Sequence, residues 1–143
     1  SKDLAPAHWQ ALLKALQRQL ARPHVAGVVI THGTDTLEET AYWLQALLAP
    51  QKPVVLTCAM RPATALAPDG PQNLLDALAV AGLDGAKGVT AVCAGKLHSA
   101  LDVQKVHPYR LDAFDSGEAG PLGYVEEGVV RLVNAWPLAV RLA

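Results

Sequence analysis

The sequence predicts an α/β domain whose sheet is mostly parallel, flanked by helices and followed by a β-hairpin. Three short runs, at 25–30, 53–57 and 88–94, are almost continuously apolar. Such runs are typical of strands that are buried on both faces of a parallel sheet. Segments with apolar residues at helical spacing separate the three runs. The order strand, loop, helix, strand is the signature of βαβ units, so we expect a largely parallel sheet.

The first half of the chain supplies a helix, a strand and a second helix. Apolar residues recur at helical spacing over 9–20, and Pro6 is suited to the first turn of that helix. The first strand, 25–30, is followed by a polar turn at 31–36 that contains a glycine. Helical spacing then resumes over 37–48 and stops just before a proline, which is a usual helix boundary.

The second half begins with the strand at 53–57, which leads into a long loop at 60–70. This loop contains two prolines and a glycine, residues that interrupt regular structure. Pro71 can occupy the first turn of the next helix, which extends to about Ala81 and precedes the strand at 88–94.

The last third has a different character. Residues 96–114 are polar, and we expect them to be irregular. A glycine-rich turn follows at 117–123, and the apolar pairs around 124–133, interrupted by Glu126, Glu127 and Gly128, predict a terminal hairpin.

Composition limits the classes of function. The chain has 143 residues, which fits one domain, and 51% of them are hydrophobic against 17% charged. This is more apolar than a small self-contained domain needs, so either another domain or subunit covers part of the surface or the helices are unusually apolar. The 12 basic and 13 acidic residues are dispersed, so no basic patch predicts nucleic-acid binding.

Cofactor, metal and membrane classes lack their sequence signals. Neither GxGxxG nor GxxxxGK[ST] occurs, and the five histidines and two cysteines show no metal-ligand spacing. Cys58 and Cys93 lie in apolar runs, and we expect buried free thiols, with a single disulfide as the alternative. No apolar run reaches transmembrane length. The chain begins at Ser1 rather than at Met, and its first residues do not form a signal peptide. This is consistent with a processed or partial chain.

Ligands of open parallel sheets bind beyond the carboxyl ends of the strands, so the loops there are the first candidates for a site. The loop at 31–36 holds three threonine hydroxyls, Asp35 and His32. Helix capping by Thr34 or Asp35 explains one of these groups but not the cluster. Glu38 and Glu39 would complement the helix dipole. For His32 we expect a hydrogen-bonded role that orients the loop, and for His24 a place on the surface.

Two further loops carry basic residues. Arg61 follows the second strand and either binds a carboxylate or ties the long loop to backbone carbonyls, and we favour the second role. Lys105 lies further along the chain, some residues after the end of the third strand. A lysine beside a hydroxyl in a partly dry pocket can act as a base, although most lysines are solvated surface charges.

Several segments share a pattern with one known family. In order along the chain they are VITHGTDTLEET (29–40), KPVV (52–55), AMRPAT (59–64), DGPQNL (69–74), HSA (98–100), DVQK (102–105) and GPLGY (120–124). This ordered series, which covers nearly the whole chain, resembles the bacterial-type L-asparaginase family (asparaginases and glutaminases). The resemblance implies a flavodoxin-like amino-terminal domain over 1–143 and hydrolysis of L-asparagine to aspartate and ammonia, without metal or cofactor.

By residue-wise match, the resemblance assigns a supporting triad to Thr34, Asp35 and Lys105. Lys105 would accept or relay a proton through Thr34, and Asp35 would hold the α-ammonium group of the substrate. The main chain of Ala59 would lie near the leaving amide. Ser1 matches a serine that binds the α-carboxylate. Lys2 stands where many members have glutamine, a departure that bears on the α-carboxyl contacts and on the amino-acid preference.

Two parts of the family pattern find no match in the chain. These are the first strand with its GGTI-like motif, which supplies the attacking threonine, and the smaller carboxy-terminal domain. We therefore expect the 143 residues alone to be inactive. The resemblance further implies a homotetramer in the cytoplasm or the periplasm.

The alternatives to an L-asparaginase are a glutaminase-asparaginase, an asparaginase-like amidotransferase subunit, or, in another class, a non-catalytic α/β module. A nucleotide-binding domain is a more distant alternative.

Overall fold

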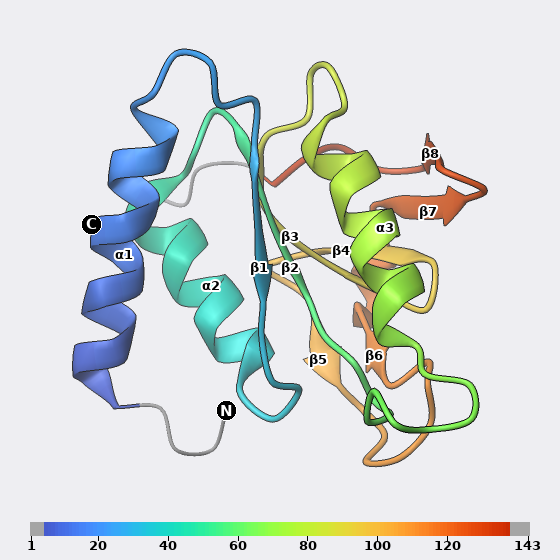
Figure 1. Cartoon of the computed structure of the whole chain (residues 1–143). Helices are drawn as coiled ribbons and strands as arrows, with labels where there is room; N and C mark the ends of the chain where they lie inside the picture. The colour runs from blue at the N-terminus through green and yellow to red at the C-terminus, as the bar shows by residue number, and fades with distance from the viewer. Residues whose placement is uncertain (1–4, 138–143) are drawn as a thin grey trace.

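The computed structural model describes residues 5–137, and these form a sheet covered by helices on both faces (Figure 1). The helices are α1 (Pro6–Leu20), α2 (Leu37–Leu48), α3 (Gly70–Ala81) and the 3₁₀ turn η1 (Gly117–Ala119). The strands are β1 (Val28–Thr31), β2 (Pro53–Thr57), β3 (Gly88–Cys93), β4 (Lys96–Ser99), β5 (Gln104–Lys105), β6 (Phe114–Asp115), β7 (Gly123–Glu126) and β8 (Val129–Leu132). The predicted α/β class is confirmed.

The main sheet has the strand order β1-β2-β3-β4-β7-β8. Strands β1, β2 and β3 are parallel, as the βαβ pattern predicts, because a helix connects each to the next. From β3 onward the neighbours are antiparallel. The short strands β5 and β6 form a separate antiparallel pair.

Two tight turns build the antiparallel part of the sheet. Ala94 and Gly95 both have positive φ angles, 51° and 74°, and connect β3 to β4. Glu127 and Gly128, at 50° and 78°, connect β7 to β8 in the same way. Two central residues with positive φ are the hairpin turn whose twist matches that of the flanking strands. The predicted terminal hairpin is thus confirmed.

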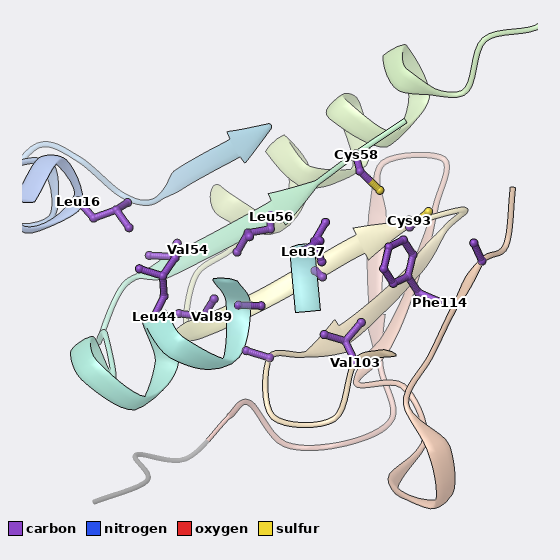
Figure 2. Close-up of a cluster of buried hydrophobic side chains, with 14 residues drawn as sticks. Leu16, Leu37, Leu44, Val54, Leu56, Cys58, Val89, Cys93, Val103 and Phe114 are labelled. Atoms are coloured by element: carbon purple, nitrogen blue, oxygen red, sulfur yellow. The ribbon is translucent and has the colours of Figure 1, made fainter. Parts of the chain in front are cut away.

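Alternation along the strands divides the core between the two faces of the sheet. On one face, Val54 and Leu56 of β2 and Val89 of β3 pack with residues of α1 and α2, among them Leu16 and Leu44 (Figure 2). On the other face lies a second cluster, to which β2, β3, β4, β7 and α3 contribute. The helices α1 and α2 therefore cover one face and α3 covers the other, which leaves the ends of the strands for a site.

Three expectations from the sequence need correction. Residues 96–114 are not wholly irregular, because they contain β4, β5 and the start of β6. The first strand is not buried on both faces, because it lies at the edge of the sheet and its residues are partly exposed. The N-cap of α2 is Thr36 rather than Thr34 or Asp35.

The expectations for the two cysteines and for His24 are confirmed. Cys58 and Cys93 are free and buried, and His24 is exposed. Between residues 5 and 137, no helix is both long and apolar enough to cross a membrane.

Candidate active site

The residues assigned to the triad come from two distant parts of the chain. Thr34 and Asp35 lie in the turn between β1 and α2, beyond the carboxyl end of β1. Lys105 ends the short strand β5, which pairs with β6 and places Lys105 opposite Phe114. A loop beyond a parallel strand is where ligands of this fold class bind.

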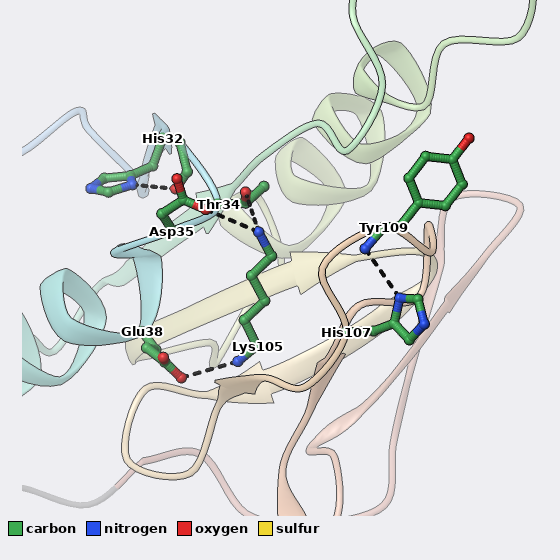
Figure 3. A network of polar contacts seen from close by, with 8 residues as sticks. His32, Thr34, Asp35, Glu38, Lys105, His107 and Tyr109 are labelled. Atoms are coloured by element: carbon green, nitrogen blue, oxygen red, sulfur yellow. Dashed lines mark hydrogen bonds and ion pairs between the residues drawn. The ribbon is translucent and has the colours of Figure 1, made fainter. Parts of the chain in front are cut away.

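The Lys105 side chain reaches across to the turn and joins both partners (Figure 3). Its Nζ donates a hydrogen bond to Thr34 Oγ1 at 2.8 Å and lies 3.1 Å from Asp35 Oδ1. The Lys105 side chain is 17% exposed and that of Asp35 is 59% exposed. An ion pair this exposed adds little to stability, so the arrangement positions the three groups more than it holds the fold together.

The main chain of Lys105 is fixed independently of its ammonium group. Its backbone N–H donates to Glu38 Oε2 at 3.0 Å (Figure 3). Glu38 lies in the first turn of α2, so the helix that follows Thr34 and Asp35 also holds the strand that carries Lys105. The sequence predicted only a helix-dipole role for Glu38, and no local signal points to this long-range contact.

His32 orients the turn, as expected from the sequence. Its backbone N–H donates to Thr57 O at 2.9 Å, which ties the turn to the end of β2. The ring nitrogens lie 2.7 Å from Gly33 O and 2.9 Å from Thr40 Oγ1. Since Thr40 is buried in α2, the imidazole links the turn to the helix on its carboxyl side.

The loop after β2 is held by two side chains for which the sequence alone predicted no role. Asp69 accepts hydrogen bonds from the backbone N–H groups of Met60 and Arg61, at 2.9 Å for the shortest contact to each. Asn73 donates to Cys58 O at 2.9 Å. Together these contacts fix the main chain on both sides of Ala59. Both residues lie in the matched segment 69–74, which was the available signal.

Arg61 has the structural role that we favoured. Its Nη1 donates to Ala67 O at 2.9 Å and thereby closes the long loop on itself. Ala59 is exposed at the start of this loop. An open cleft of about 680 Å³ separates the loop from residues 109–112. Thr34, Asp35 and Lys105 do not line that cleft, so the cleft and the polar cluster are distinct features.

The structure thus brings Thr34, Asp35 and Lys105 together and places Ala59 at the neighbouring strand end. Ser1 and Lys2 lie outside the described residues. Within residues 5–137, no group of three or more His, Cys, Asp or Glu side chains is arranged to hold a metal ion. The site therefore offers a hydroxyl, a carboxylate and an ammonium group in mutual contact, which is a set suited to proton transfer and to binding a charged amino acid.

The chain matches the family model "Asparaginase, N-terminal" over residues 1–137. It is 44% identical over 127 residues to "Probable L-asparaginase 4" of Schizosaccharomyces pombe, covering 87% of this chain and 36% of that protein. It is 48% identical over 106 residues to "Glutaminase-asparaginase" of Pseudomonas fluorescens biotype A, covering 73% of this chain and 29% of that protein.

A solved structure shares the fold. The crystal structure of "Probable Cytoplasmic L-asparaginase" from Campylobacter jejuni superposes with a TM-score of 0.90 at 44% identity, covering 94% of this chain and 43% of that one. The chain spans about a third of the length of the two curated relatives, at 36% and 29%. From the family match and these relatives, we conclude that the chain belongs to the asparaginase family and corresponds to its N-terminal domain.

Proposed function

We propose that this chain carries the supporting half of an L-asparagine amidohydrolase site, formed by Thr34, Asp35 and Lys105. The single observation that carries the proposal is the 2.8 Å contact from Lys105 Nζ to Thr34 Oγ1, made between groups 71 positions apart in the sequence. A lysine held against a threonine hydroxyl, with an acid on the other side, is an arrangement for moving a proton.

The proposed reaction begins with attack by a threonine from outside these 143 residues on the side-chain amide carbonyl of asparagine. Ammonia leaves, an aspartyl ester of that threonine forms, and water then releases aspartate. Thr34 passes the proton of the attacking hydroxyl to Lys105, which accepts it as a neutral amine and returns it to the leaving amide nitrogen, so that this nitrogen departs as ammonia. Asp35 binds the α-ammonium group through a charge-assisted contact, and the main chain at Ala59 lies near the leaving amide. Ser1 binds the α-carboxylate.

The wider assignment follows from the same proposal. Residues 1–143 are the larger part of a catalytic amino-terminal domain, and a longer protein supplies the attacking threonine and the second domain. We further propose a homotetramer and a location in the cytoplasm or the periplasm. The Campylobacter jejuni relative is a "Probable Cytoplasmic L-asparaginase".

A matched set of variants tests the triad in a longer protein that contains this chain. Thr34→Val keeps the shape of the side chain and removes the hydroxyl, and Lys105→Met removes the ammonium group. Each is expected to lower kcat for ammonia release from asparagine by about 10²- to 10⁴-fold, because proton transfer is lost. Thr34→Ser, which retains the hydroxyl, is expected to keep most of the activity.

Lys96→Met is the control for loss of a lysine, because Lys96 pairs with Asp112 and not with the triad. Asp35→Asn is expected to raise KM rather than lower kcat alone, by about 10- to 150-fold, the equivalent of one hydrogen bond to a charged group. If Thr34→Val and Lys105→Met turn over asparagine as fast as the Lys96→Met control, the proposed roles are wrong.

A glutaminase-asparaginase is the second candidate, since a relative of that name is 48% identical to this chain. Comparing kcat/KM for asparagine and for glutamine in the same protein separates the two. If neither amide is hydrolysed and the substrates do not bind, a non-catalytic α/β module becomes the better description.

A further inference from the structure

Two thiols outside the triad lie at the ends of neighbouring strands. In the parallel register of β2 and β3, Thr57 pairs with Val92, so the next residues, Cys58 and Cys93, follow side by side. Both side chains belong to the same core cluster, since they continue the alternation of each strand (Figure 2). Neighbouring strands lie about 4.8 Å apart, which falls within the Cα separation that a disulfide spans.

Asn73 clamps the two strand ends together. Its Nδ2 donates to Cys58 O at 2.9 Å, and its Oδ1 accepts from Ala94 N, the residue after Cys93, at 3.2 Å. Asn73 is itself 3% exposed and buried in α3. A buried side chain that bonds both strands limits their separation, so the two sulfur atoms are held near each other.

The two thiols already interact, and the interaction moves their pKa values in opposite directions. A hydrogen bond from the Cys58 S–H to the Cys93 sulfur lowers the pKa of the Cys93 thiol below its ordinary value, although burial acts against this. The same hydrogen bond, together with burial, raises the pKa of Cys58. The lowered pKa favours Cys93 as the first sulfur to react, because the thiolate is the nucleophile in thiol chemistry. To form the thiolate, Cys93 must give up the proton that its Sγ donates to Leu111 O at 3.4 Å.

We propose that Cys58 and Cys93 are a peroxide-sensitive dithiol that closes to an intramolecular disulfide between β2 and β3. The two sulfur atoms lie at adjacent strand ends, on one face of the sheet, and Asn73 forms hydrogen bonds to the main chain of both strands there. This modification site is independent of the catalytic role proposed for Thr34, Asp35 and Lys105. The two cysteines are 6% and 3% exposed, so the oxidant must be as small as hydrogen peroxide.

The chemistry balances with one peroxide for each chain. The Cys93 thiolate attacks one oxygen of hydrogen peroxide, the O–O bond breaks, and hydroxide leaves with the proton that the thiol released, as water. The sulfenic acid of Cys93 is then attacked by the sulfur of Cys58, which loses its proton, and a second water leaves as the S–S bond forms. Two thiols are oxidised and one peroxide is reduced to two waters. A dithiol reductant reverses the step.

Peroxide titration of the folded protein tests the proposal. Thiols are counted with Ellman's reagent after quenching and denaturation, and the unreduced chain is digested with trypsin. Lys87 lies between the two cysteines, so cleavage there leaves them on separate peptides. We expect the two thiols of this chain to disappear together, a linked pair of peptides to appear, and dithiothreitol to restore both thiols.

Single variants provide the controls. In Cys58→Ser, Cys93 is expected to reach the sulfenic or sulfinic acid without a linked peptide, and in Cys93→Ser the remaining thiol is expected to react more slowly. The proposal fails if wild type yields two separately oxidised cysteines, a link between chains, or two thiols that survive peroxide. The peptide map of wild type decides the matter even if a serine variant folds poorly.

Discussion

Replacing His98 by glutamine is predicted to make the protein less sensitive to acid. His98 lies in β4, is 1% exposed, and has Nδ1 at 2.7 Å from Ser116 Oγ. Within the described part of the chain, its Nε2 atom has no hydrogen-bond partner. Burial and the nearby charge of Lys96 lower the pKa of His98 from 6.5 to about 4, against the opposing charges of Asp112 and Asp115. The imidazolium ion would carry an N–H on Nε2 with nothing to accept it.

The sign and size of the effect follow from the two pKa values. Because the folded pKa of His98 is below the unfolded value, the unfolded chain binds the proton more readily, and stability falls as the pH drops from 6.5 toward 4. A pKa difference of one corresponds to about 1.4 kcal/mol, so the full loss is about 3 kcal/mol. Of this, about 2 kcal/mol is lost between pH 7 and pH 5.

Urea unfolding at pH 7, 6 and 5, followed by tryptophan fluorescence, measures this loss. Wild type is expected to lose about 2 kcal/mol more than His98→Gln over that range, since glutamine does not titrate. His24→Gln, at an exposed position, is the matched control and should follow wild type. Parallel losses in wild type and His98→Gln would refute the reasoning.

Two further substitutions test the packing of the fold. Gly123→Ala places a Cβ against the carbonyl oxygen of Arg131 on β8 and should lower stability by about 2 kcal/mol. Gly82→Ala, where the nearest atom is 3.5 Å away, should be tolerated, and equal unfolding midpoints for the two variants would contradict this prediction. Lys52→Met removes two hydrogen bonds of 2.9 Å from Nζ, one to the carbonyl group of Leu20 at the end of α1 and one to that of Arg22 just beyond it, so a loss of about 1–2 kcal/mol is expected in urea unfolding. Lys14→Met on the exposed surface of the same helix is the control, and a loss as large as that of Lys52→Met would argue against the role given to Lys52.

The helix-connected part of the fold was predictable because its hydrophobic pattern is strong. Strand β2 and helix α2 have the predicted bounds, and β3 is shorter by one residue. Strand β4 was not predicted, because His98 and Ser99 are buried polar residues that hide the apolar pattern. Strands β5 and β6 have two residues each, too few for any periodicity to appear. The edge position of β1 depends on the order of strands, which local pattern does not encode.

The candidate site was likewise predictable only in part. The hydroxyl-rich turn after β1 stood out from its own composition, but Lys105 did not, since its contact with Thr34 joins residues 71 positions apart. Only the resemblance to a family paired these residues. The supports from Glu38, Asp69 and Asn73 are bonds from side chains to main-chain groups, and the main-chain partner of such a bond leaves no mark in the sequence.

Ammonia release from asparagine, by the 143-residue chain alone and by a longer protein that contains it, tests the central claim most directly. No measurable release is predicted for the chain alone, because the attacking threonine lies outside it. The longer protein is predicted to release ammonia steadily, and Lys105→Met is predicted to lower that rate by about 10²- to 10⁴-fold. Asparagine-dependent release by the chain alone that disappears in Thr34→Ala would contradict the account, since Thr34 would then be the attacking group. Absence of release by the longer protein would contradict the assignment as an asparaginase.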